Sequence, residues 1–406
     1  MSQTFDVLII GGGAAGITVA ASLKRRKTGL NVGLIEPSQI HYYQPALTLV
    51  GAGVQTLGQN TRAELSLIPD GVNWIRDRVD AFDPERNEVV LAGGSAIGYE
   101  QLVICPGLVC AWDRVAGLAE TLGQNSVSSN YSPEHAAYTW ESLQNLGPGD
   151  GPAVFTQPPM PIKCPGAPQK IVYLAADYLR KKGRPARDVV FHTATPGIFG
   201  VPYFARALLQ VMEEYGADFT MGSNLVRVDG ANKIATFAKE GEETEVKFGM
   251  LHVTPPQIAP ECISKSSLAD DAGWLDVNQE TLQSNGFENI FGLGDATNTP
   301  NSKTAAAVRK QSPVVIDNLL SLRSGAELTA AYDGYASCPL TTAYGKMMLA
   351  EFRYGGQVTP TIPLSPKVSR RSYWYIKTIA LPVLYWNYML KGYEYDVAHN
   401  VDFVED

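Results

Sequence analysis

The chain has 406 residues, too many for one ordinary domain, so we expect two or three compact units. An apolar fraction of 45% excludes a disordered or fibrous chain, and a net charge of −8 argues against nucleic-acid binding. The five scattered cysteines lack Cys-x-x-Cys spacing, which argues against a secreted disulfide framework and against a metal site. A strand pattern begins at Phe5 without a charged or apolar leader, so we expect no signal peptide.

The chain opens with a predicted strand, glycine turn and helix. The apolar strand 7–10 runs into the glycine-rich turn 11–16, and a second strand, 31–35, ends in an acidic residue. Three of the glycines fit G-x-G-x-x-G, which permits a tight turn, close approach of a pyrophosphate and close helix–strand packing. The pattern predicts a dinucleotide site, with phosphates at the helix N-terminus and ribose at the acid. The expected cofactor-binding residues here are Gly11, Gly13, Ala14, Ala15, Gly16 and Glu36.

Strands and helices alternate further along the chain, as is typical of an α/β fold. The last predicted strand, 289–293, ends in Gly294 and Asp295. An aspartate there can accept a hydrogen bond from a ribityl hydroxyl, and the helix that follows can point its N-terminus at the flavin ring. Coupled to the N-terminal motif, this second half favours FAD. Other predicted strands lie around 73–79, 88–91, 101–104, 154–155 and 189–192, and helices at 170–182, 202–214 and 304–322.

The middle of the chain lacks a second nucleotide fingerprint. The strand at 154–155 is followed by the loop 156–166, which contains four prolines and no glycine cluster. Prolines have no N–H group and obstruct the approach of a pyrophosphate, so this loop is badly suited to nicotinamide nucleotides. It presents Cys164 instead. The Gly-Pro-rich patch 147–152 reads as a linker before this second unit.

These features resemble the sulfide:quinone oxidoreductase family, in particular its mitochondrial-like branch with two redox cysteines. The absence of a cysteine at 126–129 and of a histidine at 198–200 favours that branch. The resemblance spans nearly the whole chain. The matching stretches are HYYQP at 41–45, LVGAG at 49–53, KCPGAPQK at 163–170, IFGV at 198–201, KTAAA at 303–307, YDGYASCPL at 332–340 and LAEF at 349–352.

The resemblance implies a redox disulfide, or sulfur-bridged pair, between Cys164 and Cys338 beside FAD. Hydrosulfide can attack a disulfide sulfur, leave a persulfide on one cysteine and release the other as a thiolate. By resemblance, Cys338 carries the persulfide and Cys164 faces the flavin. Lys163 is placed to lower a thiolate pKa, although an adjacent side chain can also point away. The resemblance adds Gln44, Gly107, Lys303 and Thr304 to the cofactor-binding residues, and Cys105, Cys110 and Cys262 are expected to be ordinary apolar cysteines.

A basic and aromatic segment, 370–391, is expected to contact a membrane. Its uncharged run, 378–390, has 13 residues, fewer than the roughly 20 of a spanning helix, so it suits a segment lying in the interface. Pro382 is expected to split it into two short helices. Packing on the protein's own core or in a dimer interface is the alternative. Phe352 and Tyr354 are expected to line a quinone channel, although core packing is open for both.

We therefore predict two Rossmann-like domains, the second without NAD binding, and a C-terminal amphipathic membrane-contact region. The expected boundaries are 1–113 with 286–330, then 114–285, then 331–406. Expected partners are sulfide, a quinone, a sulfur acceptor such as glutathione, sulfite or coenzyme A, the membrane surface and possible second copies in a homodimer. A monotopic protein of a bacterial inner membrane is expected. The open alternatives are a flavocytochrome-type sulfide dehydrogenase subunit, a type II NADH:quinone dehydrogenase, which needs the missing central fingerprint, and a non-enzymatic flavin-bound scaffold.

Overall fold

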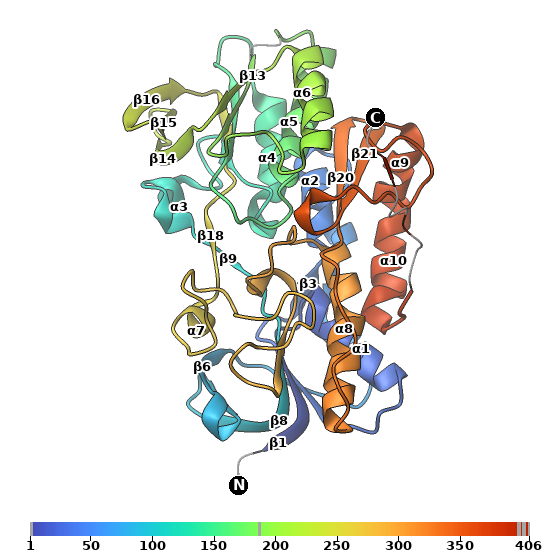
Figure 1. Cartoon of the computed structure of the whole chain (residues 1–406). Coiled ribbons are helices and arrows are strands. Elements are labelled where there is room, and N and C mark those ends of the chain that lie inside the picture. The colour runs from blue at the N-terminus through green and yellow to red at the C-terminus, as the bar shows by residue number, and fades with distance from the viewer. Residues whose placement is uncertain (1–2, 186–187, 396–398, 400–402, 405–406) are drawn as a thin grey trace.

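Two largely parallel sheets organise the computed structural model, which describes residues 3–185, 188–395, 399 and 403–404 (Figure 1). The first sheet has the order β5-β2-β1-β8-β7-β6, with β19 also paired to β8. Its strands β5, β2, β1, β8 and β19 are parallel, and β7 and β6 continue it as an antiparallel edge. The strands are β1 (Thr4–Ile10), β2 (Val32–Ile35), β5 (Val72–Ile75), β6 (Val79–Asp83), β7 (Glu88–Leu91), β8 (Ala96–Ile104) and β19 (Ile290–Gly292).

The second sheet is wholly parallel, with the order β10-β17-β11-β12-β13. It is built from residues between 127 and 252, so each half of the chain's α/β pattern has its own sheet, as predicted. The strands are β10 (Val127–Ser128), β11 (Ala153–Gln157), β12 (Val189–Thr193), β13 (Asp218–Met221) and β17 (Met250–His252). Smaller pairings join β14 (Asn224–Asp229), β15 (Ile234–Lys239) and β16 (Glu242–Lys247), β9 (Val109–Cys110) with β18 (Gln257–Ile258), and β3 (Ile40–Tyr42) with β4 (Thr61–Ala63).

The central strands are apolar on both faces because helices cover them. Val7, Leu8 and Ile9 of β1 are fully buried, as expected of a strand in the middle of a covered parallel sheet. Helices α1 and α8 pack side by side against it (Figure 1). The helices are α1 (Ala14–Arg25), α2 (Leu47–Gly51), α3 (Leu118–Thr121), α4 (Pro133–Asn145), α5 (Ala167–Lys181), α6 (Pro202–Tyr215), α7 (Glu261–Ser264) and α8 (Ala305–Arg323).

The C-terminal region adds a hairpin and a long helix beside both sheets (Figure 1). Strands β20 (Ala336–Ala343) and β21 (Lys346–Phe352) form the hairpin, and β20 packs against α5. The helix then runs through α9 (Arg371–Tyr375), a π-helical turn (Ile376–Ala380) and α10 (Leu381–Asn387). The predicted region 331–406 extends past residue 395 into positions that lie largely outside the described residues.

The expected break at Pro382 is wrong, because the helix continues through it. Proline cannot donate to the carbonyl four residues earlier, that of Thr378. Gln55 Nε2 supplies that hydrogen bond instead, at 3.2 Å, and the π-helical turn just before the proline accommodates its ring. Residues 371–387 therefore form a single helix with one π-helical turn, and the loop that carries Gln55 is bound to it.

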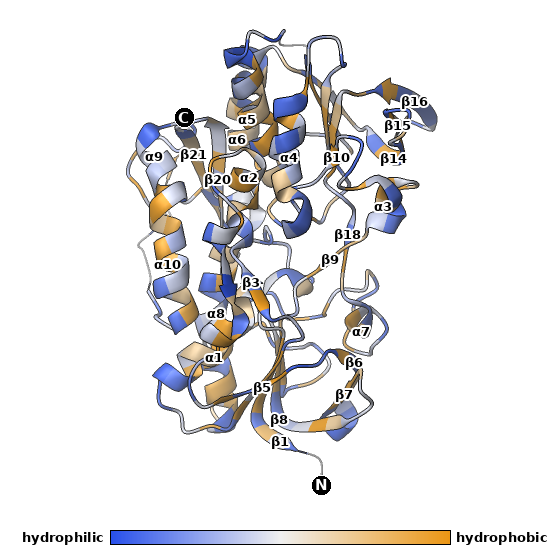
Figure 2. Ribbon diagram, turned by 180° about the vertical axis from the view of Figure 1, so that it is seen from behind, coloured by the Kyte–Doolittle hydropathy of each residue, from blue (hydrophilic) through white to orange (hydrophobic). Residues whose placement is uncertain are grey.

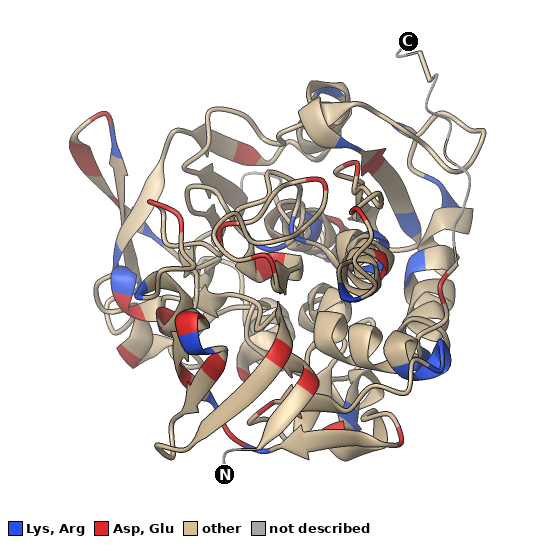
Figure 3. Cartoon of the chain, turned by 60° about the horizontal axis from the view of Figure 1, so that its bottom comes forward, with Lys and Arg blue, Asp and Glu red and all other residues tan. Residues whose placement is uncertain are grey.

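One face of this helix is exposed and apolar. Tyr375, Ile379 and Val383, each four residues apart, are 62%, 58% and 47% exposed. Figure 2 shows hydrophobic residues along α10, and Figure 3 shows the distribution of basic and acidic residues over the whole chain. Segment 370–391 contains four basic residues and no acidic one. Within the described residues, no helix has the length and apolar character needed to cross a membrane.

Candidate active site

The glycine turn between β1 and α1 has the geometry of a phosphate cradle. Gly11 adopts φ +100°, which disfavours any side chain, and a Cβ on Gly16 would collide with the Gly11 carbonyl oxygen. The space beside Gly13 is open, and α1 begins directly after it. The N–H groups of the first turn therefore face a free volume, as a pyrophosphate requires.

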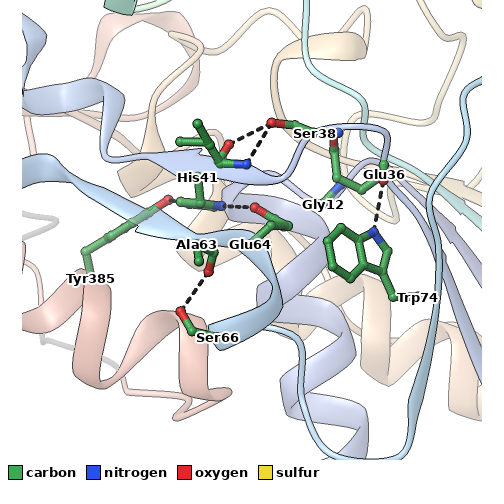
Figure 4. Close-up of polar contacts among 10 residues, drawn as sticks. Gly12, Glu36, Ser38, His41, Ala63, Glu64, Ser66, Trp74 and Tyr385 are labelled. Atoms are coloured by element: carbon green, nitrogen blue, oxygen red, sulfur yellow. Dashed lines mark hydrogen bonds and ion pairs between the residues drawn. The ribbon is translucent and has the colours of Figure 1, made fainter. Parts of the chain in front are cut away.

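The acidic end of β2 lies against this turn. Glu36 accepts hydrogen bonds from the N–H groups of Gly12 and Ser38, both at 2.7 Å (Figure 4). Burial raises the pKa of Glu36, while these two N–H donors oppose the rise. A carboxylate fixed beside the glycine turn fits the ribose-binding role predicted from its spacing.

Asp295 and Lys303, both expected at the cofactor, form a largely buried pair of opposite charge types. Burial raises the pKa of Asp295, and the nearby Lys303 opposes that rise. Lys303 donates from Nζ to the Thr297 carbonyl at 2.6 Å, and burial lowers its pKa to about 8. Thr304 caps helix α8 by accepting from the Ala307 N–H at 3.2 Å.

Two glycines expected at the site hold special backbone conformations. Gly294 adopts φ +78° and Gly107 adopts φ +79°, so both follow their strands through turns that favour glycine. Gln311 accepts from the Gly294 N–H at 2.9 Å. These turns, the glycine cradle and the carboxylates fit FAD in their donor chemistry and in the space they leave open.

Two distant segments bring Cys164 and Cys338 together. The Cys164 N–H donates to the Lys303 carbonyl at 2.8 Å, which fixes the proline-rich loop to the segment before α8. Cys338 lies on β20, against α5. Gly166 permits this approach, because a Cβ there would collide with Leu340. The two thiols are free, and their side chains are hydrogen-bonded to each other.

The surroundings of the two thiols make them unequal acids. The pKa of Cys164 lies well below its ordinary value, chiefly because the Cys338 thiol donates to it, with Lys170 as a further cause. Lys170 Nζ lies 3.0 Å from Cys164 Sγ. The pKa of Cys338 lies well above its ordinary value, because the same hydrogen bond retains its proton and burial adds to the effect. Cys164 is therefore the thiolate of the pair.

A second buried lysine reaches the pair from the C-terminal helix. Lys377 belongs to the π-helical turn, is only 4% exposed and donates to the Pro45 carbonyl at 3.3 Å. Burial lowers its pKa to about 7, Lys170 lowers it further, and Cys164 and Cys338 oppose the shift. The cysteines thus share one buried cluster with two amines from separate elements.

Sequence reasoning named Lys163 and missed both of these lysines. Lys163 Nζ instead donates to Gln44 Oε1 at 2.7 Å. Lys170 stands in the first turn of α5, where a cation opposes the helix dipole, and that mismatch was an available signal. Lys377 is an isolated charge within an apolar stretch, which was another.

The other expected residues make contacts of their own, and Phe352 shares a hydrophobic cluster with Cys338. Burial raises the pKa of Cys105, Cys110 and Cys262, so their thiols are protonated, unlike that of Cys164. Phe352 is buried against the rings of Phe199 and Phe204. Tyr354 donates to the Gln279 carbonyl at 2.8 Å and packs edge-on against Tyr332.

The fold and site define a flavin-binding oxidoreductase of the two-dinucleotide type. A family model described as pyridine nucleotide-disulphide oxidoreductase matches residues 5–136. The mitochondrial sulfide:quinone oxidoreductase of Mus musculus is 43% identical over 96% of this chain and 87% of its own. That of Dictyostelium discoideum is 42% identical over 97% and 87%. The chain belongs to the sulfide:quinone oxidoreductase family.

Comparison of structures agrees with this at the level of fold. The sulfide:quinone oxidoreductase of Aquifex aeolicus superposes with a TM-score of 0.79 at 20% identity, covering 97% of this chain and 92% of that one. The predicted α/β class with two Rossmann-like sheets is confirmed. The expectation of a bacterial inner membrane gains no support, because the relatives at 36–43% identity are named mitochondrial.

Proposed function

We propose that the chain oxidises sulfide at the Cys164–Cys338 pair, using FAD to pass the electrons to a membrane quinone. FAD-dependent oxidation of sulfide with quinone is the activity of the family to which the chain belongs. The observation that carries the assignment to this pair is the contact between two free thiols, half-buried Cys164 and buried Cys338, with the Cys164 N–H bound to the Lys303 carbonyl.

The chemistry starts from the disulfide form of the pair. Hydrosulfide attacks Cys338 Sγ, a sulfur–sulfur bond forms there, and the Cys164–Cys338 bond breaks with its electron pair leaving on Cys164. Cys338 then carries a persulfide and Cys164 is a thiolate. A nucleophilic acceptor takes the outer sulfur and leaves Cys338 as a thiol. Re-forming the disulfide releases two electrons and the thiol proton.

The lysine beside Cys164 decides the direction of attack. A thiol with a lower pKa is the better leaving group in thiol–disulfide exchange. The Lys170 ammonium, 3.0 Å from Cys164 Sγ, stabilises the departing thiolate, so Cys164 leaves and Cys338 keeps the sulfane sulfur. Lys377, whose pKa is about 7, carries positive charge only in its protonated form, and in that form it favours entry of an anion such as hydrosulfide.

Bound FAD supplies a two-electron acceptor between the cysteines and the quinone. The residues we assign to it come from the glycine cradle, the acid of β2, the loop at Gln44 and the flavin-side turns. Gly13 leaves room for phosphate, and Asp295 and Lys303 offer an acceptor and a donor at the flavin end. The full proposed set is Gly11, Gly13, Ala14, Ala15, Gly16, Glu36, Gln44, Gly107, Gly294, Asp295, Lys303 and Thr304.

The exposed apolar face of the C-terminal helix supports peripheral contact with a membrane. Tyr375, Ile379 and Val383 form its stripe, and the flanking basic residues suit anionic lipid. A quinone confined to lipid would reach the protein along this face. We assign Phe352 and Tyr354 to the quinone path, and glutathione, sulfite or coenzyme A to the role of sulfur acceptor.

We also propose the domain boundaries expected from the sequence. The first sheet combines strands from 4–104 with β19, which supports an FAD domain of 1–113 and 286–330. The second sheet lies within 127–252 and supports a domain of 114–285. The remainder, 331–406, carries Cys338 and the membrane-facing helix.

Anaerobic stopped-flow spectroscopy tests the proposal. Sulfide should bleach the flavin absorbance of the parent after a transient long-wavelength charge-transfer band, and a quinone should restore the oxidised spectrum. Cys164→Ser and Cys338→Ser should each lose sulfide-driven bleaching, whereas the control Cys262→Ser should keep it. Normal sulfide:quinone turnover in either site variant would refute the cysteine mechanism.

A further inference from the structure

A buried polar chain links the glycine turn to the C-terminal helix. His41 Nδ1 lies 3.2 Å from Glu64 Oε2, and His41 Nε2 lies 2.6 Å from the Tyr385 hydroxyl (Figure 4). All three side chains are at most 5% exposed. They come from β3, from the turn after β4 and from α10. The geometry allows the imidazole to donate from Nδ1 to Glu64 and to accept from the Tyr385 hydroxyl at Nε2.

The second carboxylate oxygen of Glu64 has no hydrogen-bond partner within the described part of the chain. It lies 2.7 Å from the position that a Cβ on Gly12 would occupy, so it faces the glycine turn. Glu36 approaches the same residue and binds its N–H at 2.7 Å. A buried carboxylate oxygen without a donor is costly, which points to a donor that arrives with a ligand.

We propose that Glu64 is a cofactor-binding residue that accepts a hydrogen bond from a hydroxyl of bound FAD, and that His41 and Tyr385 are positioning residues that aim it. Ribose and ribityl hydroxyls are donors of the required kind, and the glycine turn is where the FAD backbone passes. The inference rests on the FAD binding in the proposed function and is independent of the sulfur chemistry.

The chain of contacts has a second consequence for the helix that carries Tyr385. Tyr385 of α10 is the last residue of this chain of hydrogen bonds. Fixing Glu64 for FAD therefore also fixes His41, to which α10 is bound through Tyr385. Thermodynamic reciprocity then requires bound FAD to stabilise the docking of α10 to the same extent as docked α10 stabilises FAD. The rings of Tyr43 and Tyr385, 4.6 Å apart, fix the helix laterally without replacing the polar link.

Equilibrium binding of FAD to the reduced apo-protein, followed by flavin fluorescence without sulfide, tests this proposal. Glu64→Gln keeps one oxygen acceptor and turns the other position into a donor, so either His41 or FAD loses its acceptor. We expect FAD affinity to fall roughly tenfold in Glu64→Gln and a few-fold in Tyr385→Phe. Tyr388→Phe, which changes an exposed tyrosine at the end of the same helix, is the matched control and should bind FAD as the parent does.

Three further readouts separate ligand binding from a merely structural role. In Glu64→Gln and Tyr385→Phe, the melting temperature of the FAD-loaded form should fall by more than that of the apo-protein, which loses only the internal hydrogen bond. The double variant should lose no more affinity than Glu64→Gln alone, since Tyr385 acts through Glu64. Amide exchange of residues 381–387 should slow on FAD binding in the parent, and less so in Tyr385→Phe.

The outcomes are distinct from those of the sulfide experiments. Parental FAD affinity in Glu64→Gln, or equal losses of melting temperature with and without FAD, would overturn the inference. Either result would leave the cysteine mechanism intact. Conversely, cysteine variants that still turn over sulfide would refute the proposed sulfur chemistry without affecting the role of Glu64.

Discussion

Replacing Lys170 with methionine should raise the pH at which Cys164 ionises. The Lys170 ammonium lies 3.0 Å from Cys164 Sγ and is itself only 3% exposed, so water screens the contact little. A hydrogen bond to a charged group contributes about 1.5–3 kcal/mol. Since about 1.4 kcal/mol corresponds to a factor of ten, the acid dissociation constant of Cys164 should fall roughly ten- to a hundredfold. Methionine keeps the length and burial of the side chain.

Alkylation of the reduced protein measures this directly. Iodoacetamide reacts with the thiolate, so the rate at which the Cys164 peptide is modified, followed by mass spectrometry from pH 5 to 9, traces its ionisation. Lys163→Met is the matched control, because it removes a lysine adjacent in sequence whose Nζ binds Gln44. An unchanged profile in Lys170→Met, or a larger change in Lys163→Met, would show that the thiolate is stabilised by something other than this contact.

Two further predictions concern the C-terminal helix. The pKa of Lys377 is about 7 in the folded protein and 10.5 ordinarily, so between these pH values the unfolded chain binds more protons and the free energy of unfolding rises with pH. Lys377→Met should flatten that rise in urea unfolding at pH 7 to 10, and an unaltered slope would contradict the burial of its charge. Ile379→Asp with Val383→Asp should reduce co-sedimentation with anionic vesicles, whereas Val109→Asp, on an exposed strand on the opposite side, should not (Figure 1). Equal binding by both would refute the membrane face.

The fold was largely predictable because its signals are local. The glycine turn, the strand at 7–10 and the acid that ends β2 follow one another within 36 residues, and each constrains the next. The helices at 167–181 and 305–323 match the predicted positions within three residues. The prolines in the loop before Cys164 likewise predicted the missing nucleotide fingerprint from the chemistry of their own backbone.

The site was less predictable because its contacts are not local. No periodicity places Cys338 beside Cys164, and only resemblance to a family paired them. Lys170 and Lys377 reach the sulfurs through the packing of α5 and of the C-terminal helix, which the sequence does not encode as a motif. The prediction of a break at Pro382 was wrong for the same reason. The hydrogen bond that proline cannot donate to the Thr378 carbonyl comes from Gln55, which lies in a loop distant in sequence.

The C-terminal helix, for which we propose membrane contact, is held to the body of the protein at Gln55, Pro45 and His41. The helix is thus an integral part of the folded protein and not a separate anchor. A protease that clipped the chain ahead of residue 371 would remove an amine from the sulfur chemistry together with the lipid contact. A water-soluble fragment made this way should be chemically impaired even when supplied with a soluble quinone. A single cleavage would therefore remove both the proposed membrane contact and the contribution of Lys377 to sulfide oxidation.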